Sequence, residues 1–426
     1  HKLNWATLVA AVLAIGLLVA DRLVPEPITT GESEAAGPAA SAPASSPSGT
    51  SIAVLAFDNM SPDPENAYFA EGISEEILNV LAAVDGLKVA SRTSSFSFAG
   101  TQTPIPEIAR QLGVEHVLEG SVRKAGDRVR ITAQLIDAAA DQHLWSDAYD
   151  RDLVDIFAVQ AEIAQAITGE LAEELGILEV SVQAPTENLE SYQAFLSGRQ
   201  KFYSRGDNLD EAIAELDRAV QLDPDFADAW AVLGAALHVA PGYPTALSTE
   251  ELAKRRVQAV ERALALDPDH RLALAVSGNT MIHAYDWRNG LERLRRAASL
   301  PGQGTTPGLW LGMQLYLAGY VRESLPVLED VWQRNPIAGI NSGNLGMVYL
   351  ALGRVDQARS LLDFAAANGH PIGLPLLAGY SIDRGDLASG RAFVQEMLIY
   401  NEATNDAAAR VFVEMFFDSL QAGGVS

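Results

Sequence analysis

A small residue recurs at nearly constant spacing through the second half of the chain. Gly234, Gly278, Gly312, Gly346 and Ala378 follow one another at steps of 44, 34, 34 and 32 residues. Self-similarity at a period of roughly 20–50 residues is typical of arrays in which each unit buries its apolar face against the next. The small residues let paired helices approach closely. This periodicity therefore predicts stacked helix pairs rather than one conventional core.

The period resembles the roughly 34 residues of tetratricopeptide repeats. Apolar positions recur at helical spacing, and we attribute the longer first step to an insertion around residues 241–248. Prolines stand where helices are expected to end, at Pro224, Pro268, Pro336 and Pro371. We predict an all-α tetratricopeptide-repeat superhelix of about six repeats over residues 186–421. Residues 407–420 are expected to form a capping helix, or else, because Phe412, Phe416 and Phe417 are apolar, the array continues in a longer protein.

The N-terminal segment is apolar and uncharged over residues 5–20. Flanking apolar residues extend it to nearly the ~20 residues that cross a bilayer. We predict an N-terminal transmembrane helix within residues 1–24, and Lys2 favours a cytoplasmic N-terminus. A cleaved signal peptide is the alternative, although Leu18 and Ala20 make a poor cleavage site. Residues 25–49, rich in Pro, Ala and Ser, predict a flexible linker.

Residues 50–182 predict a small α+β domain. The alternation of Val129, Ile131, Ala133 and Leu135 with polar residues indicates a half-buried antiparallel strand. Ser94, Ser95 and Ser97 are expected in a turn. We expect strands at 51–57, 87–90, 114–124, 128–137 and 143–149, and helices at 68–84, 105–112 and 156–175.

The segments 51–81 (SIAVLAFDNMSPDPENAYFAEGISEEILNVL) and 113–164 carry a closer likeness. They resemble the TolB-like (FlgO-related) domain, although Ala56 stands where that family commonly has proline. The resemblance implies a membrane-anchored bacterial sensor or regulator. In such proteins the cytoplasmic part is a winged-helix regulator, an adenylate cyclase, a kinase or further membrane helices, and here it would lie upstream of His1.

Composition excludes several kinds of chemistry. Lys and Arg total 30 against 55 Asp and Glu, a formal charge of −25, so direct nucleic-acid binding is not expected. Cysteine is absent, which excludes disulfides, thiolate metal sites and a lipidated cysteine anchor. No nucleotide-binding, zinc-protease or serine-hydrolase motif occurs. The acidic residues near His143 read as a solvated edge. We therefore predict no catalytic, cofactor-binding or metal-binding residues, and no enzyme in this chain.

The first helices of the repeats are expected to line a groove. Its predicted residues are Asn279, Ile282, Met313, Tyr316, Met347 and Leu350. One interpretation is a hydrophobic groove for a protein or peptide, in which methionine adapts to varied partners. The other is that these residues pack between helices. Ala275 stands where a carboxylate-binding repeat carries lysine, so no carboxylate clamp is predicted.

Two classes of function remain after these exclusions. The first is a partner-binding and sensing module, anchored in the bacterial inner membrane by one span, with the bulk of the chain in the periplasm. The second is an envelope scaffold without signalling output. An effector domain upstream of His1 would favour the first, and its absence the second. An enzyme would need a buried pair of carboxylates with shifted pKa values in a deep pocket.

Overall fold

The computed structural model describes residues 50–82, 84, 86–171, 185–204, 208–300, 302, 304–368, 370, 373–400, 413–414 and 417–418. They belong to two compact units, one ending at Gln314 and the other beginning at Leu315. The expected transmembrane segment and linker, residues 1–49, lie outside the described residues, as does most of the expected terminal helix. Among the helices that are described, none combines the length and apolar character that a membrane span requires.

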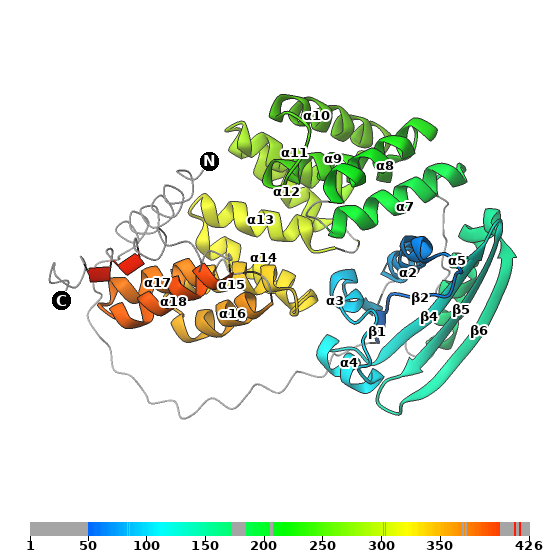
Figure 1. The fold of residues 1–426 in the computed structure, drawn as a ribbon, viewed down its shortest axis with the longest axis horizontal. Coiled ribbons are helices and arrows are strands. Elements are labelled where there is room, and N and C mark those ends of the chain that lie inside the picture. The colour runs from blue at the N-terminus through cyan, green and yellow to red at the C-terminus, as the bar shows by residue number, and fades with distance from the viewer. Residues whose placement is uncertain are drawn as a thin grey trace. The chain divides into compact units, whose positions relative to one another are not determined.

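The first unit begins with a mixed β-sheet (Figure 1). Its strands are β1 (Ser51–Val54), β2 (Asp58–Asn59), β3 (Lys88–Val89), β4 (His116–Ala125), β5 (Arg128–Asp137) and β6 (Gln142–Asp152). The strand order is β3-β1-β4-β5-β6, and β2 also pairs with β4. Strand β1 is parallel to β3 and β4, whereas β4, β5 and β6 are antiparallel. The expected small sheet region is confirmed.

The β4–β5 hairpin follows the sequence pattern closely. Gly126 in the turn has φ of +59°, a conformation that glycine adopts at little cost. Val129, Ile131 and Leu135 are at most 1% exposed. The predicted alternation is therefore correct, and it orients one face of β5 toward the core.

Two helices pack on the sheet and on each other, α2 (Ala67–Ala82) and α5 (Ile156–Glu170) (Figure 1). Helix α4 (Ile105–Leu112) ends at Gly113, whose φ of +67° is typical of a helix C-terminus. The prediction that Ser94, Ser95 and Ser97 lie in a turn was wrong for Ser94 and Ser95. Residues Arg92–Phe96 form a short helix, α3, because the Ser91 hydroxyl accepts the Ser94 N–H and caps it.

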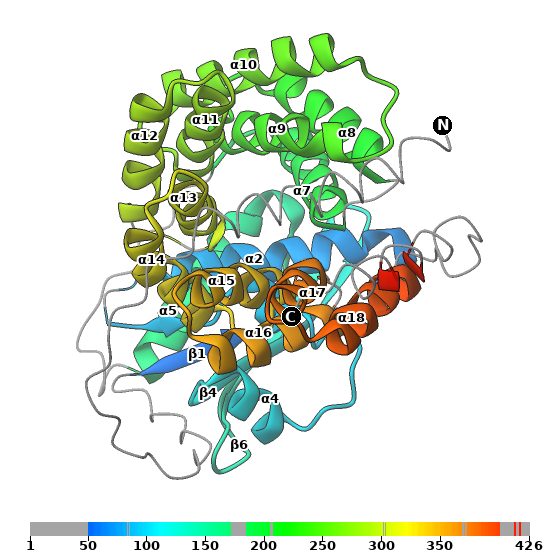
Figure 2. The same cartoon turned by 90° about the vertical axis from the view of Figure 1, so that its left-hand side faces the viewer.

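The remaining helices follow one another along the chain, and α11 lies beside both α9 and α10 (Figure 2). Within the described residues, packed neighbours are α7 with α8, α9 with α10, α11 with α12, α15 with α16, and α17 with α18. Their bounds are α7 Leu189–Ser204, α8 Leu209–Leu222, α9 Ala227–Val239, α10 Thr249–Leu266, α11 Arg271–His283, α12 Trp287–Ser299, α13 Thr306–Leu317, α14 Val321–Arg334, α15 Gly339–Ala351, α16 Val355–Ala367, α17 Gly373–Asp383 and α18 Leu387–Tyr400.

The aligned glycines lie where paired helices touch. A Cβ on Gly234 would approach Val260 to 2.8 Å, and one on Gly346 would approach Leu362 to 2.7 Å. This confirms the small-residue alignment as a packing signal. The longer first step has two sources: the segment between α9 and α10, and α10 itself, which has 18 residues against 13 in α12.

The first compact unit holds the sheet and the first repeats together. Helix α7 packs on α2 so closely that a Cβ on Gly72 would lie 2.7 Å from Leu196. Tyr192 and Phe195 of α7 are buried in the same apolar cluster as Ile73 and Ile77 of α2. The α+β region and the first repeat therefore share one core.

Candidate functional site: the junction of sheet region and first repeat

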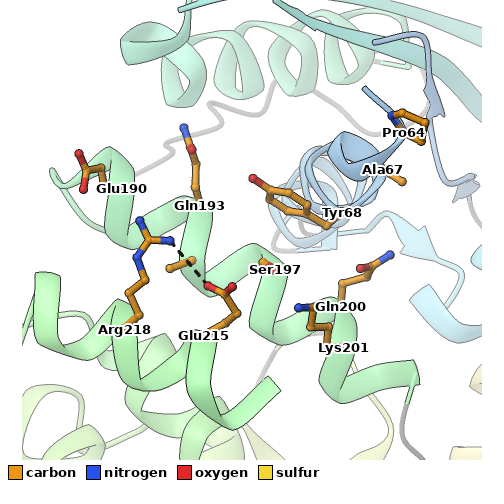
Figure 3. Close-up of a pocket in the computed structure, with 11 residues that line it drawn as sticks. Pro64, Ala67, Tyr68, Glu190, Gln193, Ser197, Gln200, Lys201, Glu215 and Arg218 are labelled. Carbon is orange, nitrogen blue, oxygen red and sulfur yellow. Dashed lines mark ion pairs between the residues drawn. The ribbon is translucent and has the colours of Figure 1, made fainter. Parts of the chain in front are cut away.

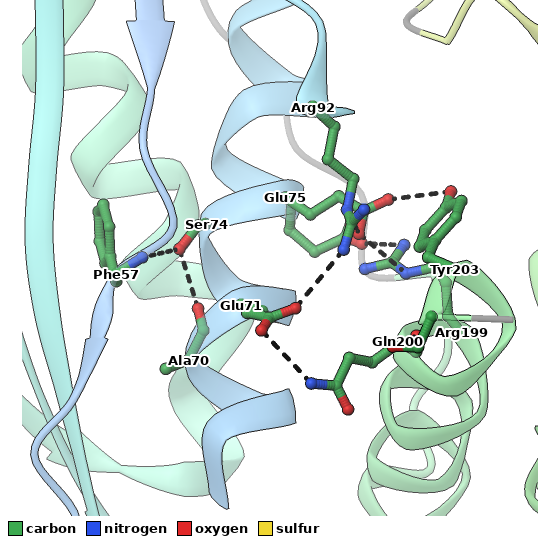
Figure 4. A network of polar contacts seen from close by, with 11 residues as sticks. Phe57, Ala70, Glu71, Ser74, Glu75, Arg92, Arg199, Gln200 and Tyr203 are labelled. Carbon is green, nitrogen blue, oxygen red and sulfur yellow. Dashed lines mark hydrogen bonds and ion pairs between the residues drawn. The ribbon is translucent and has the colours of Figure 1, made fainter. Parts of the chain in front are cut away.

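A group of charged side chains lies between α2, α3 and α7 (Figure 4). Glu75 of α2 receives Arg92 Nε at 2.8 Å and Arg199 Nε at 3.3 Å. Glu76 Oε1 lies 2.8 Å from Arg199 Nη1. The hydroxyl of Tyr203 donates to Glu75 at 3.4 Å. Two carboxylates from one helix thus meet two guanidinium groups from two others.

Burial makes this network costly unless every charge is paired. The side chains of Arg199 and Glu75 are only 7% and 9% exposed. Burial raises the pKa of Glu76, and the positive charge of Arg199 opposes that rise. Burial and the charge of Glu75 raise the pKa of Tyr203 to about 12, so its phenol stays neutral. Because removing one partner would leave a buried charge alone, the network fixes how α7 sits on α2.

Neighbouring contacts continue this arrangement. The Arg92 guanidinium lies 4.1 Å from the ring centroid of Tyr203, a cation–π contact. Gln200 donates to Glu71 at 3.3 Å. On the other side of α2, the Ser74 hydroxyl accepts the Phe57 N–H at 2.8 Å and ties the helix to the strand region (Figure 4). Helix α2 is therefore held on both sides by polar contacts as well as by apolar packing.

The sequence offered only half of this site. Ser74 and Glu75 interrupt the apolar face of α2 and are nonetheless buried, at 0% and 7% exposed. A polar residue on a core face signals a buried partner. The partners, Arg92 and Arg199, lie 17 and 124 positions further along the chain, and nothing local identifies them.

A cleft opens beside the junction, between α2, α7 and α8 (Figure 3). Its volume is about 500 Å³. Tyr68 of α2 extends toward α7, on the side of Gln193 (Figure 3), and its pKa is raised by burial and then by Glu215. Both signs of charge line the cleft, with Glu190 and Glu215 against Lys201 and Arg218. Such a lining suits a polar group. No cluster of three metal-binding side chains occurs in the described part of the chain.

The predicted groove residues occupy mixed environments. In the first unit, Asn279 is 4% exposed and accepts the Gln314 amide N–H at 3.1 Å, and Ile282 is 3% exposed. Ile282 contacts Gly290 across its own helix pair. Met313 is half-buried. In the second unit, Met347 is 7% exposed. The remaining two, Tyr316 and Leu350, are half-buried.

The acidic residues near His143 lie on strand β6. His143, Asp147, Asp150 and Asp152 are exposed, and both Asp150 and Asp152 pair with Arg128 of β5. This is the solvated edge that the sequence predicted. Charged residues on an edge strand discourage pairing with another chain.

Comparison with known proteins adds a family and one relative. The family described as TPR repeat matches residues 200–238. "Putative adenylate cyclase 3" of Rhizobium meliloti (strain 1021) is 44% identical over 198 residues, which cover 46% of this chain and 34% of the relative. The chain thus spans about a third of that relative's length. Together with the helix pairs, the family match defines a protein with tetratricopeptide repeats, which generally bind protein or peptide partners.

Solved structures show distant similarity. Pseudomonas aeruginosa pilF is 16% identical with a TM-score of 0.39, covering 55% of this chain and 99% of its own. The type IV pilus biogenesis factor PilW is 13% identical with a TM-score of 0.41, covering 52% and 98%. YrrB, described as a TPR protein with an unusual peptide-binding site, is 15% identical with a TM-score of 0.33, covering 47% and 97%.

Proposed function

We propose that this chain is the partner-binding part of a membrane-anchored bacterial regulatory protein. Its tetratricopeptide repeats bind a protein in the periplasm, and residues 1–24 cross the inner membrane once. The α+β region is a TolB-like domain between the membrane and the repeats. The chain itself is not an enzyme, and the regulated activity belongs to a segment upstream of His1.

The relative named as a putative adenylate cyclase supports this proposal. It is 44% identical over the matched region, and about two thirds of its length lies outside the match. An adenylate cyclase is one of the effectors that the TolB-like resemblance implies. We therefore propose nucleotide cyclisation as the regulated activity of the longer protein.

The observation that carries the proposal is the buried junction between α2 and α7. A partner that reoriented the first repeat would have to move Arg199 with it, because Arg199 is paired to both Glu75 and Glu76. Binding can shift a conformational equilibrium only by the difference in affinity for its two states. Because α7 is held tightly on α2, a change in the orientation of α7 that partner binding stabilises would also move α2 and the sheet.

The test first determines the membrane topology of the chain and then asks whether the chain binds a protein partner. The full chain is expressed in bacteria with one of two reporters fused to its C-terminus. Alkaline phosphatase is active only in the periplasm, and the second reporter is a protein that fluoresces only in the cytoplasm. We expect active phosphatase and no fluorescence, and the reverse result would contradict a periplasmic location. In the same cells, crosslinking at the membrane should trap a protein partner that Met313→Asp with Tyr316→Ala loses.

A control variant separates folding from binding. Arg288→Gln on α12 changes an exposed residue of another repeat helix and should retain the partner. Capture that survives the double variant would remove the predicted groove as the binding surface. If the wild-type chain crosslinks to no partner, the better description is an envelope scaffold without signalling output.

A further inference from the structure

Tyr285 occupies a backbone position where other repeats carry glycine. It lies between α11 and α12, 34 residues before Gly319, which in turn lies 34 before Gly353. Gly319, Gly353 and Gly385 each follow the first helix of a pair and have φ of +85°, +73° and +76°. Tyr285 has φ of +66° at the same place. A bulky side chain in this left-handed region is unusual, because its Cβ crowds the backbone.

The aromatic ring gains no packing in return for this strain. Tyr285 is 88% exposed, and Trp287, two residues further, is 37% exposed. Strained backbone retained at an exposed aromatic residue points to a role outside the fold. Tyrosine and tryptophan are the residues that most often anchor protein interfaces.

A second group of rings lies next to this turn. His283, the last residue of α11, is exposed and stacks on His238 of α9, with centroids 5.6 Å apart and planes inclined by 11°. His238 also contacts Trp310 of α13 at 5.1 Å. The buried Nδ1 of His238 has no hydrogen-bond partner among the described residues. Burial, then the positive charges of Arg256 and His283, lower the pKa of His238 to about 4.

Arg256 differs from the other arginines of α10. Arg255 pairs with Asp217, and Arg262 pairs with Asp225. In the described part of the chain Arg256 makes no hydrogen bond and no ion pair, and its Nε is buried. It lies one turn before Val260, which contacts Gly234, and His238 lies one turn after Gly234. The antiparallel packing of α9 and α10 therefore brings Arg256 to the histidine pair.

The stretch of sequence that carries Arg256, His283 and Tyr285 is less acidic than the rest of the chain. Residues 249–300, which include α10, α11 and α12, carry nine Lys and Arg against seven Asp and Glu. Their net charge of +2 contrasts with −25 for the whole chain. A local reversal of sign favours a partner of complementary charge.

We propose that the surface formed by Tyr285, His283, His238, Trp310 and Arg256 binds an acidic peptide segment of a partner protein. Arg256 and the imidazoles receive a carboxylate, and Tyr285 anchors an apolar neighbour. This assignment rests on the proposed function and names the chemistry of its partner. Its five residues are not among the six groove residues named in the sequence analysis, although α11 and α13 contribute to both sets.

The test uses the full chain in detergent and a fluorescent peptide in which glutamate alternates with leucine. The same peptide with glutamine is the comparison. We expect the glutamate peptide to bind about tenfold more tightly at low salt, a preference that added salt weakens. Its addition should shift the ring signals of His238 and His283 in NMR spectra. Equal affinity for both peptides would overturn the proposal.

Three variants sharpen the result. Arg256→Gln should lower affinity about fivefold or more, whereas Arg262→Gln on the same helix should leave it unchanged. Tyr285→Gly should raise the midpoint of thermal unfolding, because strain is relieved, and still weaken binding. A purely structural tyrosine would not combine those two effects. Unchanged affinity in both Arg256→Gln and Tyr285→Gly contradicts the assignment.

A single-stranded oligonucleotide serves as the competing anion. Binding of that probe as tight as the glutamate peptide, with the same loss in Arg256→Gln, would assign the site to phosphate and overturn the proposal. Failure of the glutamate peptide, combined with a periplasmic partner that the groove variant loses, would reject this site and leave the proposed function intact. A cytoplasmic C-terminus would reject the proposed function, whatever the peptide does.

Discussion

The two arginine-centred groups of the first compact unit differ in whether their charges are neutralised. At the junction, Arg199 is buried and meets Glu75 and Glu76. In the repeats, Arg256 pairs with no carboxylate among the described residues. His238 stacks on His283, which is exposed. The fold pairs the charge of the first group internally, although Arg199 Nη2 is itself buried without a hydrogen-bond partner among the described residues. The second group is left for a partner to satisfy.

This difference separates structural from binding roles better than residue type does. A buried ion pair stabilises little compared with an apolar core, but breaking it by removing one partner is costly. An unpaired, partly exposed cation costs little in water and gains when an anion displaces that water. Changes at the junction should therefore be large in stability, and changes at the repeat surface large in binding.

Replacing Arg199 should have the largest effect on stability. Arg199→Met keeps the length of the side chain but leaves Glu75 without one cation and Glu76 without its ion-pair partner. We expect a loss of about 3–5 kcal/mol in the free energy of unfolding. Chemical denaturation at neutral pH measures it. A loss below about 1 kcal/mol would mean that the junction is hydrated and does not couple α7 to α2.

Overpacking at the junction should have the next largest effect. A Cβ on Gly72 would lie 2.7 Å from Leu196, so Gly72→Leu forces α2 and α7 apart and should cost about 1–3 kcal/mol. Gly346→Leu is the matched control, since its Cβ would approach Leu362 to a similar 2.7 Å in the second unit. Both variants should lower the free energy of unfolding, and only Gly72→Leu should also alter the tryptic cleavage of the sheet region.

The fold could largely be predicted from sequence because its signals are local. The β5 alternation and the hairpin turn at Gly126 depend on residues within one strand or turn. Gly234 and Gly346 were found because a local helix-pair pattern recurs at a regular period. The helix α3 was missed because a serine cap and a serine turn look alike in sequence.

The functional surfaces were harder to predict for a different reason. Arg199 pairs with Glu75 across 124 positions, and His238 stacks on His283 across 45. No period of the sequence records such pairs. The predicted groove took in Asn279 and Ile282 on α11 and Met313 on α13, but not Arg256, because α10 is the second helix of its pair. Tyr285 could have been found by aligning it with Gly319 and Gly353.

Acid should distinguish two histidines of the repeats. His238 has its pKa lowered to about 4 by burial and nearby positive charge, so between pH 4 and about 6.5 the unfolded state takes up more protons. Its contribution to stability is therefore lost as pH falls through this window. His238→Asn should remove about 1–2 kcal/mol of the destabilisation between pH 8 and pH 5. Denaturant titrations at the two pH values measure it.

The pKa of His270 is shifted in the opposite direction, so His270 has the opposite effect on how stability changes with pH. Burial disfavours its charged form, but the hydrogen bond from Nε2 to Asp228 at 2.9 Å and the charge of that carboxylate raise its pKa overall. Its contribution is present below about pH 6.5 and is lost as pH rises through the raised pKa. His270→Asn should make the chain less stable at pH 5 than at pH 8 relative to wild type. Identical slopes in both variants would show that neither histidine controls the acid response.

The smallest effect is expected for an arginine that is paired but exposed. Arg262 is 41% exposed and its partner Asp225 is 79% exposed. Such pairs contribute about 0–1 kcal/mol, because water screens them and ordering two long side chains costs entropy. Arg262→Gln should change the free energy of unfolding by no more than about 0.5 kcal/mol and leave peptide affinity unchanged. A larger loss would show that an ion pair holds these helices together even when it is exposed. The difference between Arg199 and Arg256 would then depend on whether each has an ion-pair partner, and not on how deeply each is buried.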